Sequence, residues 1–153
     1  LAGESTSKKY YQYIKSMIVS LSLTADVKFL GDVRGDHKWE IIENALAIVA
    51  PSHTEGVSMV ALESMVSSTP VLTSREAGIQ NIDVGGGELF SLTISALVQV
   101  LTRACAWTDE ERNSRGKKAR HFVKEYYSWE KITNQYDKFY NGLNRRDPEN
   151  NID

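Results

Sequence analysis

The chain has 153 residues, of which 18 are basic and 20 acidic, so its formal net charge at neutral pH is −2. This length suits one globular domain with its own core, and the near-neutral charge gives no general surface for nucleic acid. One cysteine excludes an internal disulfide and a Cys-x-x-Cys motif, and no apolar run approaches the length of a membrane span. We therefore expect a cytoplasmic protein without a transmembrane segment.

The first third of the chain predicts mainly helices, with one short strand between them. The expected elements are the end of a strand at residues 1–3, a helix over 7–21 capped by Ser5 or Thr6, a strand over 27–30 ended by Gly31, and a short helix capped by Asp36. The strand at residues 1–3 begins abruptly, and we interpret it as the tail of a longer element.

Residues 46–74 carry the clearest pattern in the chain. Two short apolar runs, residues 46–50 and residues 70–74, flank a segment whose apolar side chains recur at helical spacing. This order predicts a βαβ unit in which the two strands are parallel neighbours. The turn over residues 51–56 then lies at the carboxyl end of the first strand. Open α/β sheets bind their ligands at that edge.

The remainder predicts a loop, a short strand and three helices. The expected elements are a glycine-rich loop over 75–87, an edge strand over 88–90, a helix with Ile94, Leu97, Val98, Leu101 and Ala104 on one face, a helix from the capping box Thr108–Glu111 to about residue 127, and a helix capped by Ser128 whose aromatic face enters the core. We expect Gly85–Gly87 to form a flexible turn and Cys105 to be buried. The strand–helix alternation predicts an α/β, Rossmann-like fold, with helices on both faces of a parallel sheet.

The turn at residues 51–56 is suited to binding an anion with neighbouring hydroxyls. A helix that starts near Val57 leaves its first N–H groups unpaired, and its dipole places partial positive charge there. Gly56 lacks a Cβ, so it can adopt an unusual φ and let a ligand approach the backbone. Glu55 and Glu63 lie eight residues apart, and a carboxylate accepts hydrogen bonds from two hydroxyls at once. On spacing alone, two solvated surface carboxylates remain the alternative.

The segment PSHTEGVSMVALESMVSSTPVLTS resembles the signature of the retaining glycosyltransferases of family 4, also called group 1, which have the GT-B fold. The signature reads Pro-Ser-x-x-Glu-Gly, a second glutamate eight positions after the first, and then Pro-Val. This chain matches it at Pro51, Ser52, Glu55, Gly56, Leu62, Glu63, Pro70 and Val71. The segment from Val27 to Val33 and the tripeptide from Tyr127 to Trp129 also resemble family motifs. Ser58 departs from the pattern because many members have glycine there.

The resemblance implies that residues 1–143 are the donor-binding, C-terminal half of a GT-B enzyme, in which part of the aromatic face of the last helix is an alternative interdomain surface. Residues 144–153 are polar with one proline, and we expect them to form a disordered tail. It implies that Glu63 accepts the ribose hydroxyls of a nucleotide and that Glu55 meets hydroxyls of the donor sugar, as the catalytic carboxylate. Backbone N–H groups from Gly56 to Val60 would hold sugar or diphosphate oxygens. The full set of expected donor-binding residues is Val33, Arg34, Ser52, Glu55, Gly56, Val57, Ser58, Met59, Val60 and Glu63.

The same resemblance implies the partners of the site. The donor is a nucleotide-diphosphate sugar, and the acceptor is a sugar or a lipid-linked molecule held by an N-terminal domain that this chain lacks. Neither a metal nor an organic cofactor is expected. The basic residues that stabilise the leaving diphosphate precede Leu1 in the family, so the isolated chain is expected not to turn over. The full-length protein is expected in the cytoplasm, with a peripheral position at the membrane as one option.

Two alternatives of other classes remain open. A GT-B-like half can bind a nucleotide or a partner protein without catalysis, and a nucleotide-sugar epimerase shares the architecture. The presence of both glutamates favours the transferase. His53 and Arg75 are lesser candidates for donor contacts, because surface side chains of these types are more often only solvated.

Overall fold

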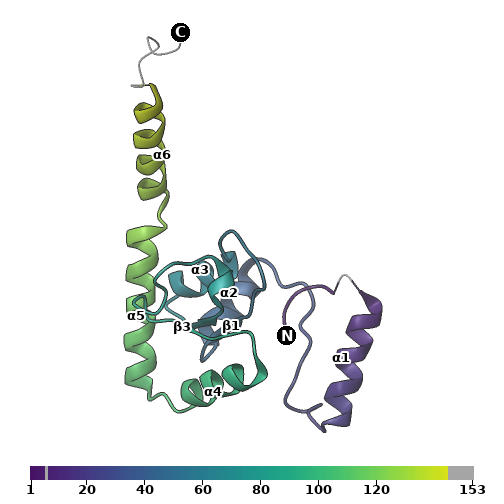
Figure 1. Ribbon diagram of the computed structural model, residues 1–153. Coiled ribbons are helices and arrows are strands. Elements are labelled where there is room, and N and C mark those ends of the chain that lie inside the picture. The colour runs from purple at the N-terminus through teal and green to yellow at the C-terminus, as the bar shows by residue number, and fades with distance from the viewer. Residues whose placement is uncertain (6, 145–153) are drawn as a thin grey trace. The chain divides into compact units, whose positions relative to one another are not determined.

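The computed structural model describes residues 1–5 and 7–144 (Figure 1). The chain divides into two compact units, Leu1–Ile41 and the part from Ile42 onward, and each is described by itself. The expected cap Thr6 and most of the expected tail, residues 145–153, lie outside the described residues. Within the described residues, no helix is long and apolar enough to cross a bilayer.

The first unit consists mainly of helix α1 (Lys8–Ser20) and two extended segments. Ser7, and not Ser5, caps α1, because its Oγ accepts a hydrogen bond from the Tyr10 N–H at 3.2 Å. The predicted strand over residues 27–30 is wrong: these residues form no strand, and the next residue, Gly31, makes one isolated parallel bridge to Ala2. Beside this bridge lie two backbone hydrogen bonds and one from the terminal amino group of Leu1 to the Lys28 carbonyl, but no strand forms, since two extended segments need further neighbours to be stable.

Helix α2 (Gly35–Asn44) joins the two units along the chain. It begins at Gly35, so Asp36 lies in its first turn and is not its cap. A carboxylate in the first turn is still favourable there because it meets the positive end of the helix dipole.

The second unit contains the expected parallel sheet. Strands β1 (Ile48–Ala50), β2 (Val71–Thr73) and β3 (Glu88–Leu89) lie side by side in chain order, and both pairings are parallel. Ile48 is opposite Val71, and Leu72 is opposite Glu88. The βαβ prediction for residues 46–74 is therefore confirmed, with helix α3 (Met59–Val66) as its crossover.

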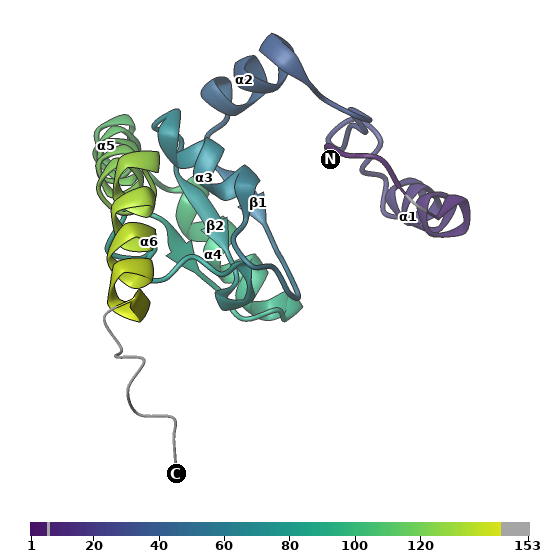
Figure 2. The same cartoon turned by 90° about the horizontal axis from the view of Figure 1, so that it is seen from above.

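Helices cover both faces of this sheet, as the sequence predicts (Figure 2). Successive side chains of a strand point to opposite faces. Accordingly, Val71 packs in one apolar cluster with α3 and helix α5 (Asp109–Tyr126), whereas Leu72 packs in a second cluster with helix α4 (Ile94–Cys105). The cluster on the α3 side is formed by Ala61, Met65, Val71, Ile79, Ile82, Ala119, Phe122 and Val123.

Helix α4 buries only part of the predicted face: Ala104 is buried and Leu97 packs against the cluster around Leu72. Val100 is fully buried, whereas Ile94 is 85% exposed and Val98 is also exposed. Cys105 is exposed too, so the expectation of a buried thiol is wrong. Apolar residues occupy much of the circumference of this helix, so the periodicity of the sequence does not fix which of them meet the sheet.

The glycine run at residues 85–87 ends a turn, as predicted, but this turn is buried against neighbouring elements. All three glycines are buried, and a Cβ built on Gly85 would lie 2.7 Å from Cγ of Phe122. Gly86 has φ +81° and lies against the backbone of Arg115, and a Cβ on Gly87 would lie 3.0 Å from the Val71 carbonyl oxygen. Glycine is needed here because α5 and β2 come too close for any side chain.

The last two helices begin at the predicted caps. Thr108 Oγ1 accepts from the Glu111 N–H at 3.1 Å to start α5, and Ser128 Oγ accepts from the Lys131 N–H at 3.4 Å to start helix α6 (Trp129–Asn144). Figure 1 shows α6 extending beyond the end of α5. The aromatic face of α6 does not enter the core of this chain: Trp129 is 82% exposed, and Tyr136, Phe139 and Tyr140 are exposed as well.

Candidate functional site

Ser74 fastens the turn after β1 to the end of β2. The Ser52 N–H donates to Oγ of Ser74 at 3.1 Å, and the same hydroxyl donates to the Ser52 carbonyl at 2.6 Å. Ser74 is buried, so these bonds are shielded from water. The expected site residue Ser52 is therefore fixed at the carboxyl edge of the sheet. Ser74 itself was not among the predicted site residues.

The short 3-10 helix η1 (Arg75–Ala77) forms a second support for this turn. The Glu55 N–H donates to the Glu76 carbonyl at 3.0 Å, and the Ser58 N–H donates to the Ala77 carbonyl at 2.8 Å. Gly78 follows η1 in the left-handed conformation, with φ +73°, and its Cα faces the Gly56 carbonyl. The loop after β2 thus determines where the backbone of residues 55–58 lies.

The supply of free N–H groups at the start of α3 is smaller than predicted. Met59 and Val60 are in the first turn, where the N–H groups have no intrahelical acceptor. The Ser58 N–H, in contrast, is already bound to Ala77, which corrects the expectation that every N–H from Gly56 to Val60 is available. The Ser58 side chain is buried, with 1% exposed, and among the described residues its hydroxyl has no hydrogen-bond partner.

The fold does not require glycine at position 56. Gly56 is not among the glycines with positive φ, and a Cβ built on it would meet no atom within 4 Å. The expectation of an unusual φ is therefore wrong. Open space beside this backbone is, however, what a ligand approaching Gly56 and the exposed Val57 needs.

The two predicted carboxylates come from the turn and from the helix that follows it. Glu55 is exposed on the turn, and Glu63 is partly buried on the second turn of α3. Both are carried by backbone that is tied to the sheet. This arrangement offers one carboxylate near the helix N-terminus and a second carboxylate farther along the helix.

Val33 and Arg34 belong to the first unit. They follow Gly31 and precede α2, and Arg34 pairs with Asp32 at 2.5 Å on the surface of that unit. Their expected role beside the nucleotide base stays a prediction.

A hollow of about 190 Å³ lies beside the site, at the carboxyl ends of β2 and β3. It is lined by Arg75, Glu76, Leu89, Phe90, Ser91 and Leu92. Of these residues, the sequence had singled out only Arg75. The hollow is formed by η1 and by the loop after β3, which are adjacent only because the two strands are paired.

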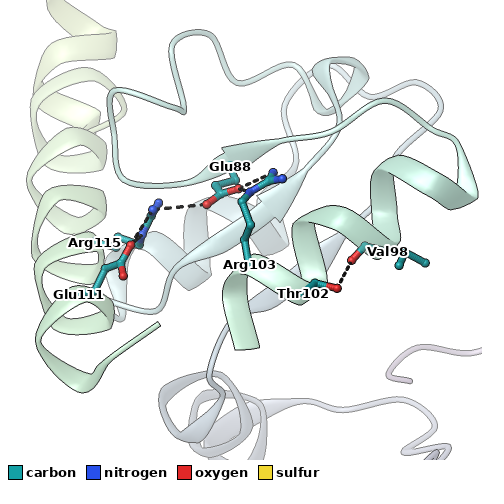
Figure 3. A network of polar contacts seen from close by, with 6 residues as sticks. All are labelled: Glu88, Val98, Thr102, Arg103, Glu111 and Arg115. Atoms are coloured by element: carbon teal, nitrogen blue, oxygen red, sulfur yellow. Dashed lines mark hydrogen bonds and ion pairs between the residues drawn. The ribbon is translucent and has the colours of Figure 1, made fainter. Parts of the chain in front are cut away.

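A polar network supports the sheet on the α4 and α5 sides (Figure 3). Glu88 of β3 accepts hydrogen bonds from Nε and an NH2 nitrogen of Arg103 at 3.0 and 2.9 Å, and it lies 3.4 Å from Arg115. Arg115 also pairs with Glu111, and its guanidinium lies 4.5 Å from the centre of the Trp107 ring. The network joins one strand to two helices and therefore stabilises the framework of the site.

The fold and this turn define the donor-side half of a GT-B protein, and the comparisons give the family. The model of the family described as Glycosyl transferases group 1 matches residues 1–122, and the chain belongs to this family. An uncharacterized glycosyltransferase of Methanocaldococcus jannaschii is 28% identical over 137 residues, which are 88% of this chain and 38% of that protein. The chain thus spans little more than a third of the length of this relative.

Solved structures with the same fold include a sucrose-phosphate synthase and a protein in complex with UDP-glucose. Sucrose-phosphate synthase from Thermosynechococcus elongatus superposes with a TM-score of 0.78 at 26% identity, over 94% of this chain and 37% of that one. Anabaena HepE in complex with UDP-glucose superposes with a TM-score of 0.76 at 17% identity, over 93% of this chain and 40% of that one. The α/β, Rossmann-like half predicted from the sequence is confirmed.

Proposed function

We propose that this chain is the donor-binding part of a retaining glycosyltransferase, which transfers a sugar from a nucleotide-diphosphate sugar to an acceptor. The observation that carries the proposal is the turn at residues 51–58, held at the carboxyl edge of the sheet by Ser74 and η1 and leading into α3. Membership of the group 1 family and the UDP-glucose bound by the Anabaena protein support it.

The chemistry of binding follows from the groups that the turn presents. The N–H groups of Met59 and Val60 and the α3 dipole favour an anionic diphosphate or a polar sugar oxygen, and the dipole contributes about 0.3–1 kcal/mol. Glu55 would accept hydrogen bonds from hydroxyls of the donor sugar, and Glu63 from those of the ribose. Hydrogen bonds to a charged group contribute about 1.5–3 kcal/mol each.

Transfer requires parts that this chain does not hold. The bond between the anomeric carbon and the diphosphate oxygen breaks as the acceptor oxygen bonds to that carbon, and the nucleoside diphosphate leaves and takes up the proton of the acceptor hydroxyl. Glu55 would orient the sugar for this exchange. We propose that no metal or organic cofactor takes part. The acceptor would lie on the rest of the protein, and the full-length enzyme would work in the cytoplasm, peripherally at a membrane.

An amide NMR titration with UDP, GDP and ADP, each with and without an attached sugar, tests donor binding. Shifts confined to residues 52–63 with one nucleotide would support the proposal and identify the base. Glu63→Gln should then weaken binding by roughly tenfold to a hundredfold, the effect of about 1.5–3 kcal/mol, while the exposed control Glu130→Gln leaves it unchanged. Equal losses in the two variants would contradict the assigned role of Glu63.

A non-catalytic GT-B module is the second candidate, and an activity assay separates it from the first. The full-length protein should transfer sugar, and the isolated chain should not. Full-length protein that binds donor but neither transfers nor hydrolyses it would favour the non-catalytic module. Interconversion of nucleotide sugars would favour an epimerase.

A further inference from the structure

The second half of α5 carries a basic face that the donor site does not use. Lys117, Arg120, His121 and Lys124 are all exposed. Apart from the adjacent pair Arg120 and His121, they are three, four or seven residues apart, so the four lie on one side of the helix, opposite its buried Ala119 and Val123. Together they cover roughly 10 Å of helix axis.

The three permanent cations of this face have no carboxylate partner in the part of the chain that the structure describes. Arg112 and Arg115, earlier on the same helix, are paired with Asp109 and Glu111. For Lys117, Arg120 and Lys124 no ion pair or hydrogen bond of the side chain is found among the described residues. The nearby Glu125 interacts mainly with Lys131, which donates to it at 3.0 Å, and more weakly with His121.

The helix dipole explains only part of this charge. Cations are favourable near a helix C-terminus, but the effect is confined to the last turn, which contains Lys124 and neither Lys117 nor Arg120. Like charges three or four residues apart also repel by a few tenths of a kcal/mol. A chain with a net charge of −2 thus concentrates unpaired positive charge on one exposed face.

We propose that this basic face of α5 binds an anionic lipid surface. The face lies on a helix with an open solvent side, which suits a flat layer of headgroups. A site for single-stranded nucleic acid would instead interleave aromatic rings with the basic residues, and this face has none. The proposal does not depend on the donor site.

Sedimentation of the chain with lipid vesicles tests the proposal. We expect binding to phosphatidylcholine vesicles that contain phosphatidylglycerol, no binding to phosphatidylcholine alone, and loss of binding as salt rises. Each cation near an anionic surface strengthens partition by about fivefold, so neutralising all three with glutamine should weaken it on the order of a hundredfold, and reversing them with glutamate should weaken it further. The test variant combines Lys117→Glu, Arg120→Glu and Lys124→Glu.

A matched control changes the net charge equally at another exposed helix. Lys8→Glu, Lys9→Glu and Lys15→Glu lie on α1, and this triple variant should keep most of the binding. Circular dichroism checks that both variants fold. In the milder glutamine versions, the α5 variant should again lose more vesicle binding than the α1 variant, with a smaller loss in each. Equal losses in the two triple variants, equal binding to neutral vesicles, or binding to heparin without binding to vesicles would overturn the proposal. The nucleotide titration should be unchanged by the α5 variant, so failure here is distinct from failure of the donor site.

Discussion

Replacing Gly78 with alanine should destabilise the chain and displace the proposed donor turn. Gly78 has φ +73°, which costs an alanine about 1–2 kcal/mol. Its Cβ would also lie 2.7 Å from the carbonyl carbon of Gly56 and 3.0 Å from the carbonyl oxygen of Glu55. Overpacking against fixed backbone costs about 1–3 kcal/mol. The two effects together predict a loss of about 2–5 kcal/mol.

Urea unfolding followed by circular dichroism measures this loss of stability. Two further variants separate the cost of the positive φ from the cost of the steric overlap. Gly56→Ala is the matched control, because its Cβ would meet nothing within 4 Å, and its effect on stability should stay within about 0.5 kcal/mol. Gly78→Asn keeps the steric clash but tolerates the left-handed conformation, so its loss should fall between those of the two alanine variants.

The nucleotide titration gives a second readout of the same change. If Gly78 positions residues 55–56, its replacement should weaken donor binding even under conditions where the variant remains folded. Equal stabilities of Gly78→Ala and Gly56→Ala, or an unchanged amide spectrum for residues 52–58, would refute the reasoning.

Three further predictions concern the framework. Gly116→Ala should lower stability by about 1–3 kcal/mol because its Cβ would lie 2.9 Å from a backbone carbonyl carbon, whereas Gly142→Ala, in open space on a helix, should raise it by about 0.5–1 kcal/mol; urea midpoints compare them. Glu88→Gln should cost about 1–3 kcal/mol by weakening bonds to two arginines, and an unchanged midpoint would contradict this role. Lys131→Gln should raise the lowered pKa of Glu125 towards its ordinary value, because the hydrogen bond and charge of Lys131 lower it. A carboxyl group whose pKa is lowered by folding adds its full stability above its ordinary pKa and loses it as pH falls through the lowered value. The link between α5 and α6 should therefore weaken over that acidic range, which NMR titration can follow.

The sequence by itself determined the βαβ unit and the place of the candidate site. Apolar runs of strand length around a helical period can form few other structures, and the carboxyl end of the first strand follows directly from chain order. The caps Thr108 and Ser128 were also predictable from the sequence. In each, the hydroxyl accepts a hydrogen bond from the N–H three residues later, and this is a local interaction. The identities of Glu55 and Glu63 as candidate ligands came from the motif alone.

The tertiary structure decided which side chains support that site. Ser74 and Gly78 meet the turn only because β2 pairs with β1, and no local pattern predicts a contact across two strands. The same holds for the glycines at 85–87. The sequence predicts a flexible turn there, and only the packing of α5 shows that they are buried. Helix α4 shows a related case, in which the helix was visible in the sequence and only packing against the sheet buried Val100 and left Ile94 and Val98 exposed. Local hydrogen bonds and hydrophobic periodicity depend on residues that are close in sequence, so they can be predicted from it. Contacts between distant segments depend on how closely the backbones approach in the folded chain.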